Sequence, residues 1–249
     1  MEIIAVFNIK GGVGKTATAV NLAALSAMAS RRTLVVDLDP QAATTWYFQA
    51  PKGLDHKVKA IAKGNKDISS SIHNTDVAFL DILPADPGMK RLDRYLAGLK
   101  KGKRWLKDLF KPVAKTYDTV IIDCPPSLSA ISENVVRNAD LVVVPLIPTT
   151  LSVRTYEQLL QHLGRERIPR EKLLPFFNLV DRRRSMHLDT MAAFRKAVPE
   201  CANIVVPYSA EVERMSAENG PIVLRSYASE PAQAYRRLWR TVRRRARGR

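Results

Sequence analysis

The most constraining feature of this 249-residue chain is a glycine-rich segment, residues 10–16 (KGGVGKT). It lies between an apolar, β-branched run at 3–8 (IIAVFN) and an alanine-rich run at 16–30 with helical spacing. Glycines allow a tight turn, and the N–H groups of such a turn and of the following helix attract phosphate groups. A strand, turn and helix of this kind restrict the chain to folds in which the turn lies at the carboxyl edge of a sheet.

Further apolar runs predict the rest of that sheet. They are continuous rather than alternating, as expected for strands buried on both faces, and helical stretches separate them. The predicted strands are 33–37, 77–83, 119–123, 141–145, 174–179 and 203–206. The sequence therefore predicts the α/β class, with a mostly parallel central sheet flanked by helices on both faces.

Length and composition favour one domain, residues 1–249, ending in a basic helix at about 230–247. A chain of this length buries enough surface to fold without disulfides. Residues 49–75 are polar and weakly patterned, and we expect a helical excursion with loops there. The two cysteines, Cys124 and Cys201, lack metal-binding spacing. They suit a reducing cytoplasm, and the absence of a long apolar run or a signal peptide argues against integral membrane association.

The glycine-rich segment is close to the pattern G-x-x-x-x-G-K-[ST]. Asn8 occupies the first position, where the pattern has glycine, but the Gly-Lys-Thr end is intact. Lys15 would contact the β- and γ-phosphates of a nucleotide, and the Thr16 hydroxyl would ligate Mg²⁺.

Acidic residues end two of the predicted strands. Asp37 and Asp39 lie in LVVDLDPQ, and Asp123 lies in TVIIDCPPS. A single aspartate at a strand end is often a turn or helix cap. Here the strand ends face the same crevice as the phosphate loop, which favours metal binding. The residues predicted to hold Mg²⁺ are Thr16, Asp39 and Asp123.

These segments together resemble the ParA/MinD family of deviant Walker A P-loop ATPases, and most of all its small, Soj-like ParA members. The resemblance rests on KGGVGKT with its additional lysine Lys10, on VVDLDPQ and on VIIDCPPS. It continues in ILPAD at 82–86, in Asn178 and in the segment 207–221.

The resemblance implies roles for individual residues. Lys10 would reach the phosphates of the partner subunit in an ATP-sandwich homodimer, and Asp39 would position the attacking water. The implied catalytic residues are Lys10, Lys15 and Asp39. The implied nucleotide-binding residues are Lys10, Gly11, Gly12, Val13, Gly14, Lys15, Thr16, Ala17, Asn178, Pro207 and Tyr208. The implied cofactors are ATP and Mg²⁺.

The chain also departs from the family pattern. Ala17 stands where Thr or Ser is usual, and Ala42 stands where DPQG has glycine. An acidic Glu-Ala pair is missing near Arg214 and Met215. None of these departures removes a catalytic group.

The charge distribution favours an anionic partner. Lys and Arg number 40 against 24 Asp and Glu, a formal net charge of +16, and half of it comes from eight arginines at 236–249. Within this helix Tyr235, Leu238, Trp239 and Val242 share one apolar face. That face either packs on the domain or stays free. It is narrow for a helix that lies on lipid.

By the resemblance, ParA-type members bind DNA non-specifically as ATP dimers, and a ParB-like or other adaptor protein stimulates hydrolysis. MinD-type members bind membranes, and electron-transfer members use paired cysteines that this chain lacks. We predict a cytoplasmic, nucleoid-associated ATPase that positions DNA or protein cargo. A MinD-like membrane-surface ATPase is the alternative, and a metabolic enzyme acting on a small acid is a third. The predicted DNA-binding residues are Arg182, Arg183, Arg184, Arg225, Arg236, Arg237, Arg240, Arg243 and Arg244.

Overall fold

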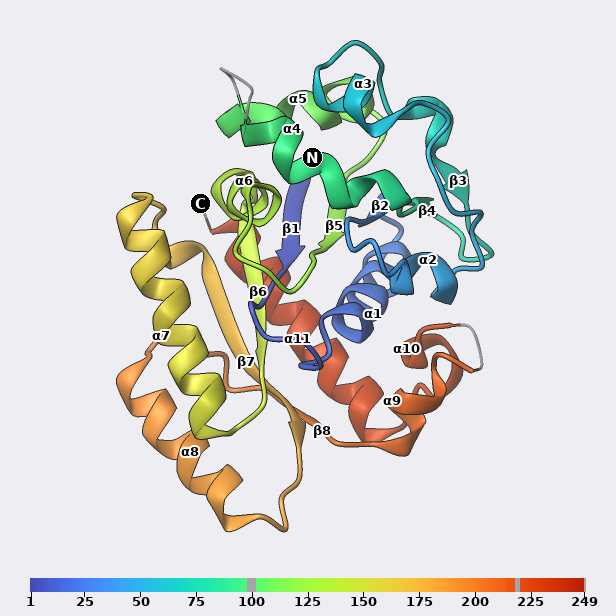
Figure 1. The fold of residues 1–249 in the computed structure, drawn as a ribbon. Coiled ribbons are helices and arrows are strands. Elements are labelled where there is room, and N and C mark those ends of the chain that lie inside the picture. Colours follow the sequence, from blue (N-terminus) through green and yellow to red (C-terminus); the bar gives the residue numbers. More distant parts are fainter. Residues whose placement is uncertain (98–101, 218–219, 249) are drawn as a thin grey trace.

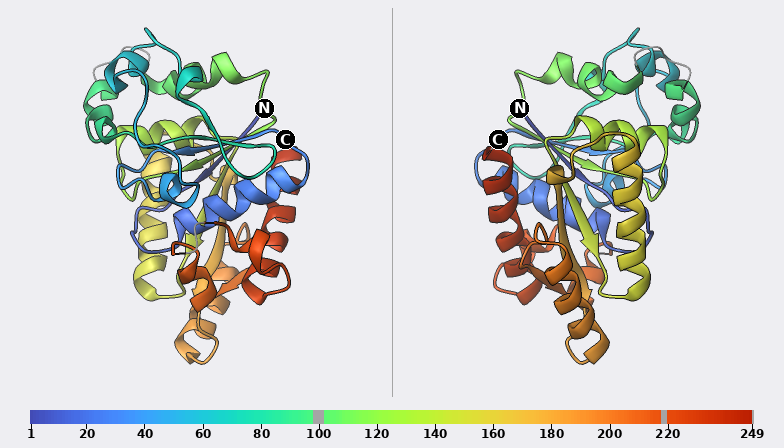
Figure 2. Two further views of the ribbon diagram at one scale, coloured as in Figure 1. Left: turned by 90° about the vertical axis from the view of Figure 1, so that its right-hand side faces the viewer. Right: turned by 90° about the vertical axis from the view of Figure 1, so that its left-hand side faces the viewer.

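The strands form one sheet with helices on both of its faces (Figures 1 and 2). The computed structural model describes residues 1–97, 102–217 and 220–248. Within these residues the sheet has eight strands in the order β3-β4-β2-β5-β1-β6-β7-β8, and each neighbouring pair is parallel except β3 and β4. The strands are β1 (Glu2–Val6), β2 (Thr33–Asp37), β3 (His73–Asn74), β4 (Leu80–Leu83), β5 (Thr119–Asp123), β6 (Leu141–Leu146), β7 (Leu173–Val180) and β8 (Val205–Pro207).

The helices connect these strands. The α-helices are α1 (Lys15–Met28), α2 (Ala43–Tyr47), α3 (Val58–Ala62), α4 (Leu92–Ala97), α5 (Trp105–Phe110), α6 (Ala130–Asn138), α7 (Thr150–Arg165), α8 (Ser185–Ala197), α9 (Ala210–Arg214), α10 (Ile222–Arg225) and α11 (Glu230–Arg247). Short 3-10 turns are Ser69–Ser71, Pro87–Arg91, Gly102–Arg104, Lys111–Val113 and Arg170–Lys172.

Each central strand is buried on both faces. In β1, Ile3 and Ala5 join the core under α3 to α8, whereas Ile4 and Val6 join the core under α1 and α9 to α11. Every one of these side chains is excluded from water, and each buried isoleucine or valine stabilises the fold by roughly 1.5–3 kcal/mol. This two-sided burial explains the continuous apolar runs, and the predicted α/β class is confirmed.

Two differences from the predicted strands concern one edge of the sheet. The strand predicted at 77–83 begins only at Leu80, because the Leu80 N–H donates to the Val77 carbonyl in a turn and Phe79 has φ 65°. The segment 49–75 contains α3 and also β3, an antiparallel edge strand of two residues that pairs with β4. So short a strand has no apolar pattern that the sequence could reveal.

The basic helix α11 packs on the domain. Its apolar residues Tyr235, Leu238, Trp239 and Val242 are all buried in the core shared with α1. The Ser229 side chain accepts from an N–H of its first turn. Of the two alternatives left open by the sequence, the structure shows that this face packs on the domain. In the described ranges, no helix combines the length and apolarity needed to span a bilayer.

Candidate nucleotide-binding site

The glycine-rich loop lies at the carboxyl edge of the sheet, between β1 and α1 (Figure 1). Strand β5 pairs with β1 on one side and β2 on the other. Asp123 is therefore in register with both Val6 and Asp37. The parallel pairing thus brings the loop and the acidic strand ends predicted from the sequence to one edge.

Asn8 anchors the start of the loop. Its side chain is buried, and Nδ2 donates to the Pro145 carbonyl of β6 at 2.8 Å while Oδ1 accepts from the Lys10 N–H at 2.9 Å. Asn8 thus performs a structural role at the motif position where glycine is usual. A pattern match registers only the mismatch, so the sequence analysis missed this role.

Gly14 sets the end of the loop and the start of α1. Its φ is +84°, and a Cβ built at this position would collide with Nδ2 of Asn178. Helix α1 has no side-chain N-cap, which leaves backbone N–H groups of its first turn available to an anion. The loop is therefore suited to a phosphate group.

Lys15 is buried behind this loop. Its Nζ donates to the Lys10 carbonyl at 3.1 Å. Burial lowers the pKa of Lys15, and the nearby Asp123 and Asp39 carboxylates act in the opposite direction. A phosphate beside this ammonium group would favour its charged form. Lys10 itself is half-buried.

Asp123 is the buried acid of the site. Its Oδ2 accepts hydrogen bonds from the hydroxyls of Thr16 and Thr44, each at 2.8 Å. Its Oδ1 is buried and has no partner in the described part of the chain. Burial, together with the neighbouring Asp37, raises the pKa of Asp123 to about 7.

Asp37 and Asp39 have different environments. Oδ2 of Asp37 accepts from both the N–H and the hydroxyl of Thr45, and burial raises the pKa of Asp37 to about 6. Asp39 is half-buried, and its Oδ1 accepts from the Gln41 N–H. Asp37 is therefore a structural residue, and Asp39 is the acid that remains accessible.

Thr16 and Asp123 fit a magnesium ion. Mg²⁺ in nucleotide sites is held by one or two protein oxygens, phosphate oxygens and water. The buried Oδ1 of Asp123 offers a carboxylate oxygen beside the Thr16 hydroxyl. Asp39, the third residue predicted to hold the metal, contacts Gln41 in this structure. Over the described ranges, no group of three or more His, Cys, Asp or Glu residues forms an all-protein metal site.

Three of the implied nucleotide-binding residues, Asn178, Pro207 and Tyr208, lie near the ends of β7 and β8. Asn178 donates from Nδ2 to the Val13 carbonyl at 2.8 Å, and its buried Oδ1 has no partner among the described residues. Pro207 pairs with Val180 across the two strands, and Tyr208 follows it with an exposed ring. The fold thus brings Asn178 against the loop and places Pro207 and Tyr208 on the adjacent strand.

Thr44 contacts Asp123, and no pattern in the sequence predicted this contact. It is fully buried at the start of α2, after the loop that carries Asp39. The sequence contains two adjacent threonines, Thr44 and Thr45, and no local signal tells which of them faces Asp123. The left-handed conformation of Ala42, φ 59°, sets the direction in which α2 begins.

The arginines predicted to bind DNA fall into two regions, apart from the exposed Arg225 at the end of α10. The first is the turn after β7, where Arg183 and Arg184 pair with Asp181. Arg182 pairs with Glu230 at 2.9 Å, which joins this turn to the first turn of α11. Arg183 is 88% exposed, so these ion pairs leave the turn open to solvent.

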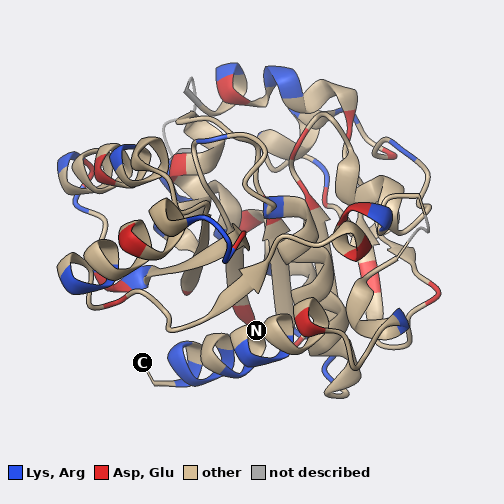
Figure 3. Cartoon of the chain, turned by 90° about the horizontal axis from the view of Figure 1, so that it is seen from below, with Lys and Arg blue, Asp and Glu red and all other residues tan. Residues whose placement is uncertain are grey.

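The second region is α11, whose arginines are visible along the helix in Figure 3. Arg236 stacks over the Tyr227 ring, and Arg243 lies over the Trp239 ring. Arg245 donates to the carbonyl of Glu171 in the 3-10 turn before β7 and to that of Leu173 at the start of β7. Four arginines of α11 are exposed, and none has an ion-pair or hydrogen-bond partner for its guanidinium group within the described residues. These four are Arg237, Arg240, Arg244 and Arg247.

Comparisons with known proteins agree with this geometry. A family model described as an AAA domain matches residues 1–171. The chain is 32% identical to the chromosome partitioning protein ParA of Myxococcus xanthus (strain DK1622), over 97% of this chain and 87% of that protein. It is 30% identical to the sporulation initiation inhibitor protein Soj of Bacillus subtilis (strain 168), over 97% and 98%. The structure of cobyrinic acid a,c-diamide synthase from Mycobacterium smegmatis with bound ADP and magnesium matches with a TM-score of 0.82 and 27% identity, over 100% and 97%.

Proposed function

Since this chain belongs to the ParA/MinD family of P-loop ATPases, we propose that it is a partition ATPase that works on the nucleoid. It hydrolyses ATP with Mg²⁺, forms an ATP-sandwich homodimer and binds DNA without sequence preference. A ParB-like or other adaptor protein stimulates hydrolysis and so releases the dimer from DNA. The relatives ParA and Soj, which match over nearly the whole chain, support this proposal.

The nucleotide site supports hydrolysis. Thr16 and Asp123 hold Mg²⁺, which neutralises charge on the β- and γ-phosphates when it is bound. The loop N–H groups of residues 11–17 and Lys15 bind the phosphates. Asp39 orients the attacking water in this proposal, and the accessibility of its side chain, in contrast to the buried Asp37, supports that role. Lys10 of each subunit stabilises the phosphate charge of the other.

The adenine base lies against β7 and β8 in this proposal. The unpartnered Oδ1 of Asn178 can accept from an exocyclic amino group. Pro207 and Tyr208 border the same region from β8.

The burial of the apolar face of α11 is the observation that favours DNA over lipid. Tyr235, Leu238, Trp239 and Val242 all lie in the core, so this face has no side chain left to enter a membrane. The exposed arginines Arg237, Arg240, Arg244 and Arg247 lie along one side of the helix and can contact successive phosphates. Arg182, Arg183, Arg184 and Arg225 are exposed as well. Arg236 and Arg243 contribute less to DNA binding, because their guanidinium groups already lie over aromatic rings.

The test is binding to a non-specific DNA duplex with ATP, with ADP and without nucleotide, over a salt series. Four phosphate contacts predict a salt slope of about −3.6, so a fourfold rise in salt weakens binding roughly 150-fold. A variant in which Arg237, Arg240, Arg244 and Arg247 are Gln should lose most of this binding. The control removes the same charge from the exposed Lys57, Lys59, Lys63 and Lys66 and should bind DNA normally.

Other outcomes would overturn the proposal. Equal DNA binding in all nucleotide states would remove the ATP switch. Binding to anionic vesicles but not to DNA would favour the MinD-like alternative. ATP turnover that responds to cobyrinic acid but not to DNA would favour the activity of the synthase relative.

A further inference from the structure

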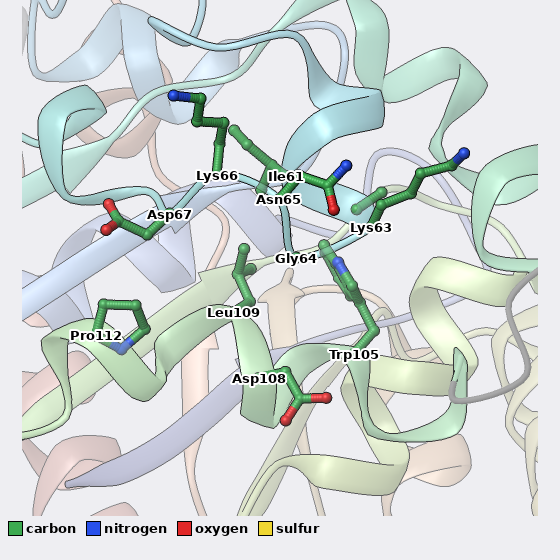
Figure 4. A pocket seen from close by; sticks show the side chains of 11 residues that line it. Ile61, Lys63, Gly64, Asn65, Lys66, Asp67, Trp105, Asp108, Leu109 and Pro112 are labelled. Carbon is green, nitrogen blue, oxygen red and sulfur yellow. The ribbon is translucent and has the colours of Figure 1, made fainter.

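A second cavity lies away from the nucleotide-binding loop, between α5 and the turn that follows α3 (Figure 4). Its volume is about 610 Å³, within the usual range for ligand pockets. One wall consists of residues 61–67 and the other of Trp105, Asp108, Leu109 and Pro112. None of the residues assigned above to nucleotide, metal or DNA lines it.

Trp105 supplies a hydrogen-bond donor that no described residue uses. The residue is only 5% exposed, and its Nε1 has no acceptor in the described part of the chain. In Figure 4 its indole ring rises from α5 toward Gly64 on the opposite wall. A buried N–H without an acceptor is costly, and an oxygen of a bound ligand would satisfy it.

The floor of the pocket is apolar. Ile61, Trp105 and Leu109 line both this pocket and a smaller cavity beneath it. Leu38, which also lines the smaller cavity, directly precedes Asp39.

The rim offers both donors and acceptors. Lys63 and Lys66 lie on the α3 side, and Asp67 and Asp108 carry carboxylates. The wider surroundings are basic, since residues 57–67 and 102–115 contain nine Lys and Arg but only these two acids. The exposed Lys107 is one of the flanking cations.

We propose that this pocket binds an acidic segment of a protein partner. One apolar side chain of the segment fills the floor, a backbone carbonyl accepts from Nε1 of Trp105, and flanking carboxylates lie near Lys63 and Lys66. A polypeptide presents both N–H and C=O groups, which matches the mixed rim. A nucleic acid strand carries a negative charge at every nucleotide, so some charges would face Asp67 and Asp108, whereas a peptide can confine its carboxylates to the side of Lys63 and Lys66.

The experiment selects nine-residue peptides from a random phage-displayed library on the immobilised full chain, without nucleotide or DNA. Failure of this test therefore leaves the proposed function untouched. We expect enriched peptides to share one large apolar residue flanked by Asp or Glu. The strongest is then synthesised with a fluorescent label, and its affinity is measured by anisotropy.

Four variants locate the bound peptide. Asn65→Trp places a bulky side chain on the exposed turn over the pocket and should abolish binding. Trp105→Phe should weaken binding about fivefold, the loss of one hydrogen bond. Lys63→Gln with Lys66→Gln should weaken it several-fold at low salt. The matched control, Lys57→Gln with Lys59→Gln, removes equal charge outside the pocket and should leave the affinity unchanged.

Three results would overturn the proposal. The first is the absence of enrichment over the empty support. The second is a selected peptide that binds the Asn65→Trp variant as tightly as the unmodified chain. The third is a single-stranded oligonucleotide whose binding is lost in the Asn65→Trp variant, which would assign the pocket to nucleic acid. Asn65 is exposed, so these results do not depend on how well Trp105→Phe folds.

Discussion

The hydroxyl of Thr44 donates a 2.8 Å hydrogen bond to Oδ2 of Asp123, the same oxygen that accepts from Thr16. Thr16 belongs to α1 and Thr44 to α2. One carboxylate therefore joins the helix that follows the glycine-rich loop to the helix that follows the Asp39 loop. A change in the charge of Asp123 therefore alters hydrogen bonds to both helices, α1 and α2.

Removing the Thr44 hydroxyl should destabilise the protein. Thr44→Val keeps the shape of the side chain but leaves Oδ2 of Asp123 with one donor in place of two. We expect the free energy of unfolding to fall by about 1–3 kcal/mol, as for a buried hydrogen bond to a charged group. Urea unfolding at neutral pH measures this. Thr44→Ser keeps the hydroxyl and is the control, and equal stability of the Val variant would contradict the role of the bond.

Stability should fall as the pH rises. The pKa of Asp37 is raised to about 6 and that of Asp123 to about 7, whereas unfolded aspartate titrates near pH 3.9. Between about pH 4 and pH 7 the folded protein holds more protons than the unfolded chain, so the free energy of unfolding decreases across this window. With these pKa values we expect a loss of about 4 kcal/mol between about pH 5 and pH 8.

Two comparisons test the origin of this pH dependence by urea unfolding. Asp123→Asn cannot ionise at this position and should show a shallower decrease. Magnesium should stabilise the unmodified protein more at the alkaline end, because it binds the ionised carboxylate. An unchanged slope in Asp123→Asn would show that another group is responsible.

Glycine should be required at position 14 and not at position 11. Gly14→Ala combines a φ of +84° with a collision against the Asn178 amide, whereas a Cβ at Gly11 meets nothing within 4 Å. We expect Gly14→Ala to lower the free energy of unfolding by roughly 1–3 kcal/mol and Gly11→Ala to change it by at most about 0.5 kcal/mol. Adding Asn178→Ala should recover part of the loss. Equal stability of the two alanine variants would contradict this account of the loop.

Substitutions of Asp39 and Lys15 should affect different steps, namely ATP hydrolysis and ATP-dependent dimerisation. Asp39→Ala keeps the loop and Lys15, so it should bind ATP and dimerise yet hydrolyse about a hundredfold more slowly. Lys15→Gln removes the buried cation that we propose contacts phosphate, and it should abolish ATP-dependent dimerisation. Phosphate release and sedimentation measure the two properties. Normal turnover by Asp39→Ala would show that another group orients the water.

Alanine substitutions of two neighbouring residues of α11 should have very different effects on stability and on DNA binding. Trp239 is 7% exposed in the core, so Trp239→Ala should lower the free energy of unfolding by about 3–5 kcal/mol. Arg240 is exposed, and Arg240→Ala should change it by at most about 0.5 kcal/mol while weakening DNA binding. Urea unfolding and a DNA titration of both variants check this. A stable, DNA-binding Trp239→Ala variant would contradict the packing of the helix.

Local sequence patterns predicted many features of the candidate site before the structure was known. The β-branched runs that end at Asp37 and Asp123 indicated parallel strands, and the parallel pairing then brought both acids to one edge. The spacing of Tyr235 and Leu238 gave the buried side of α11. Asn8 and Thr44 could not be recognised, because their partners Pro145 and Asp123 are distant in sequence.

The sequence alone determined the central strands, the glycine-rich loop and the apolar face of α11, because these depend on side-chain periodicity and backbone geometry within a few residues. Only the tertiary structure decided which acid is buried and which arginines keep free guanidinium groups, since burial depends on neighbours from other elements. The pocket beside Trp105 likewise exists only because α5 packs near the turn after α3.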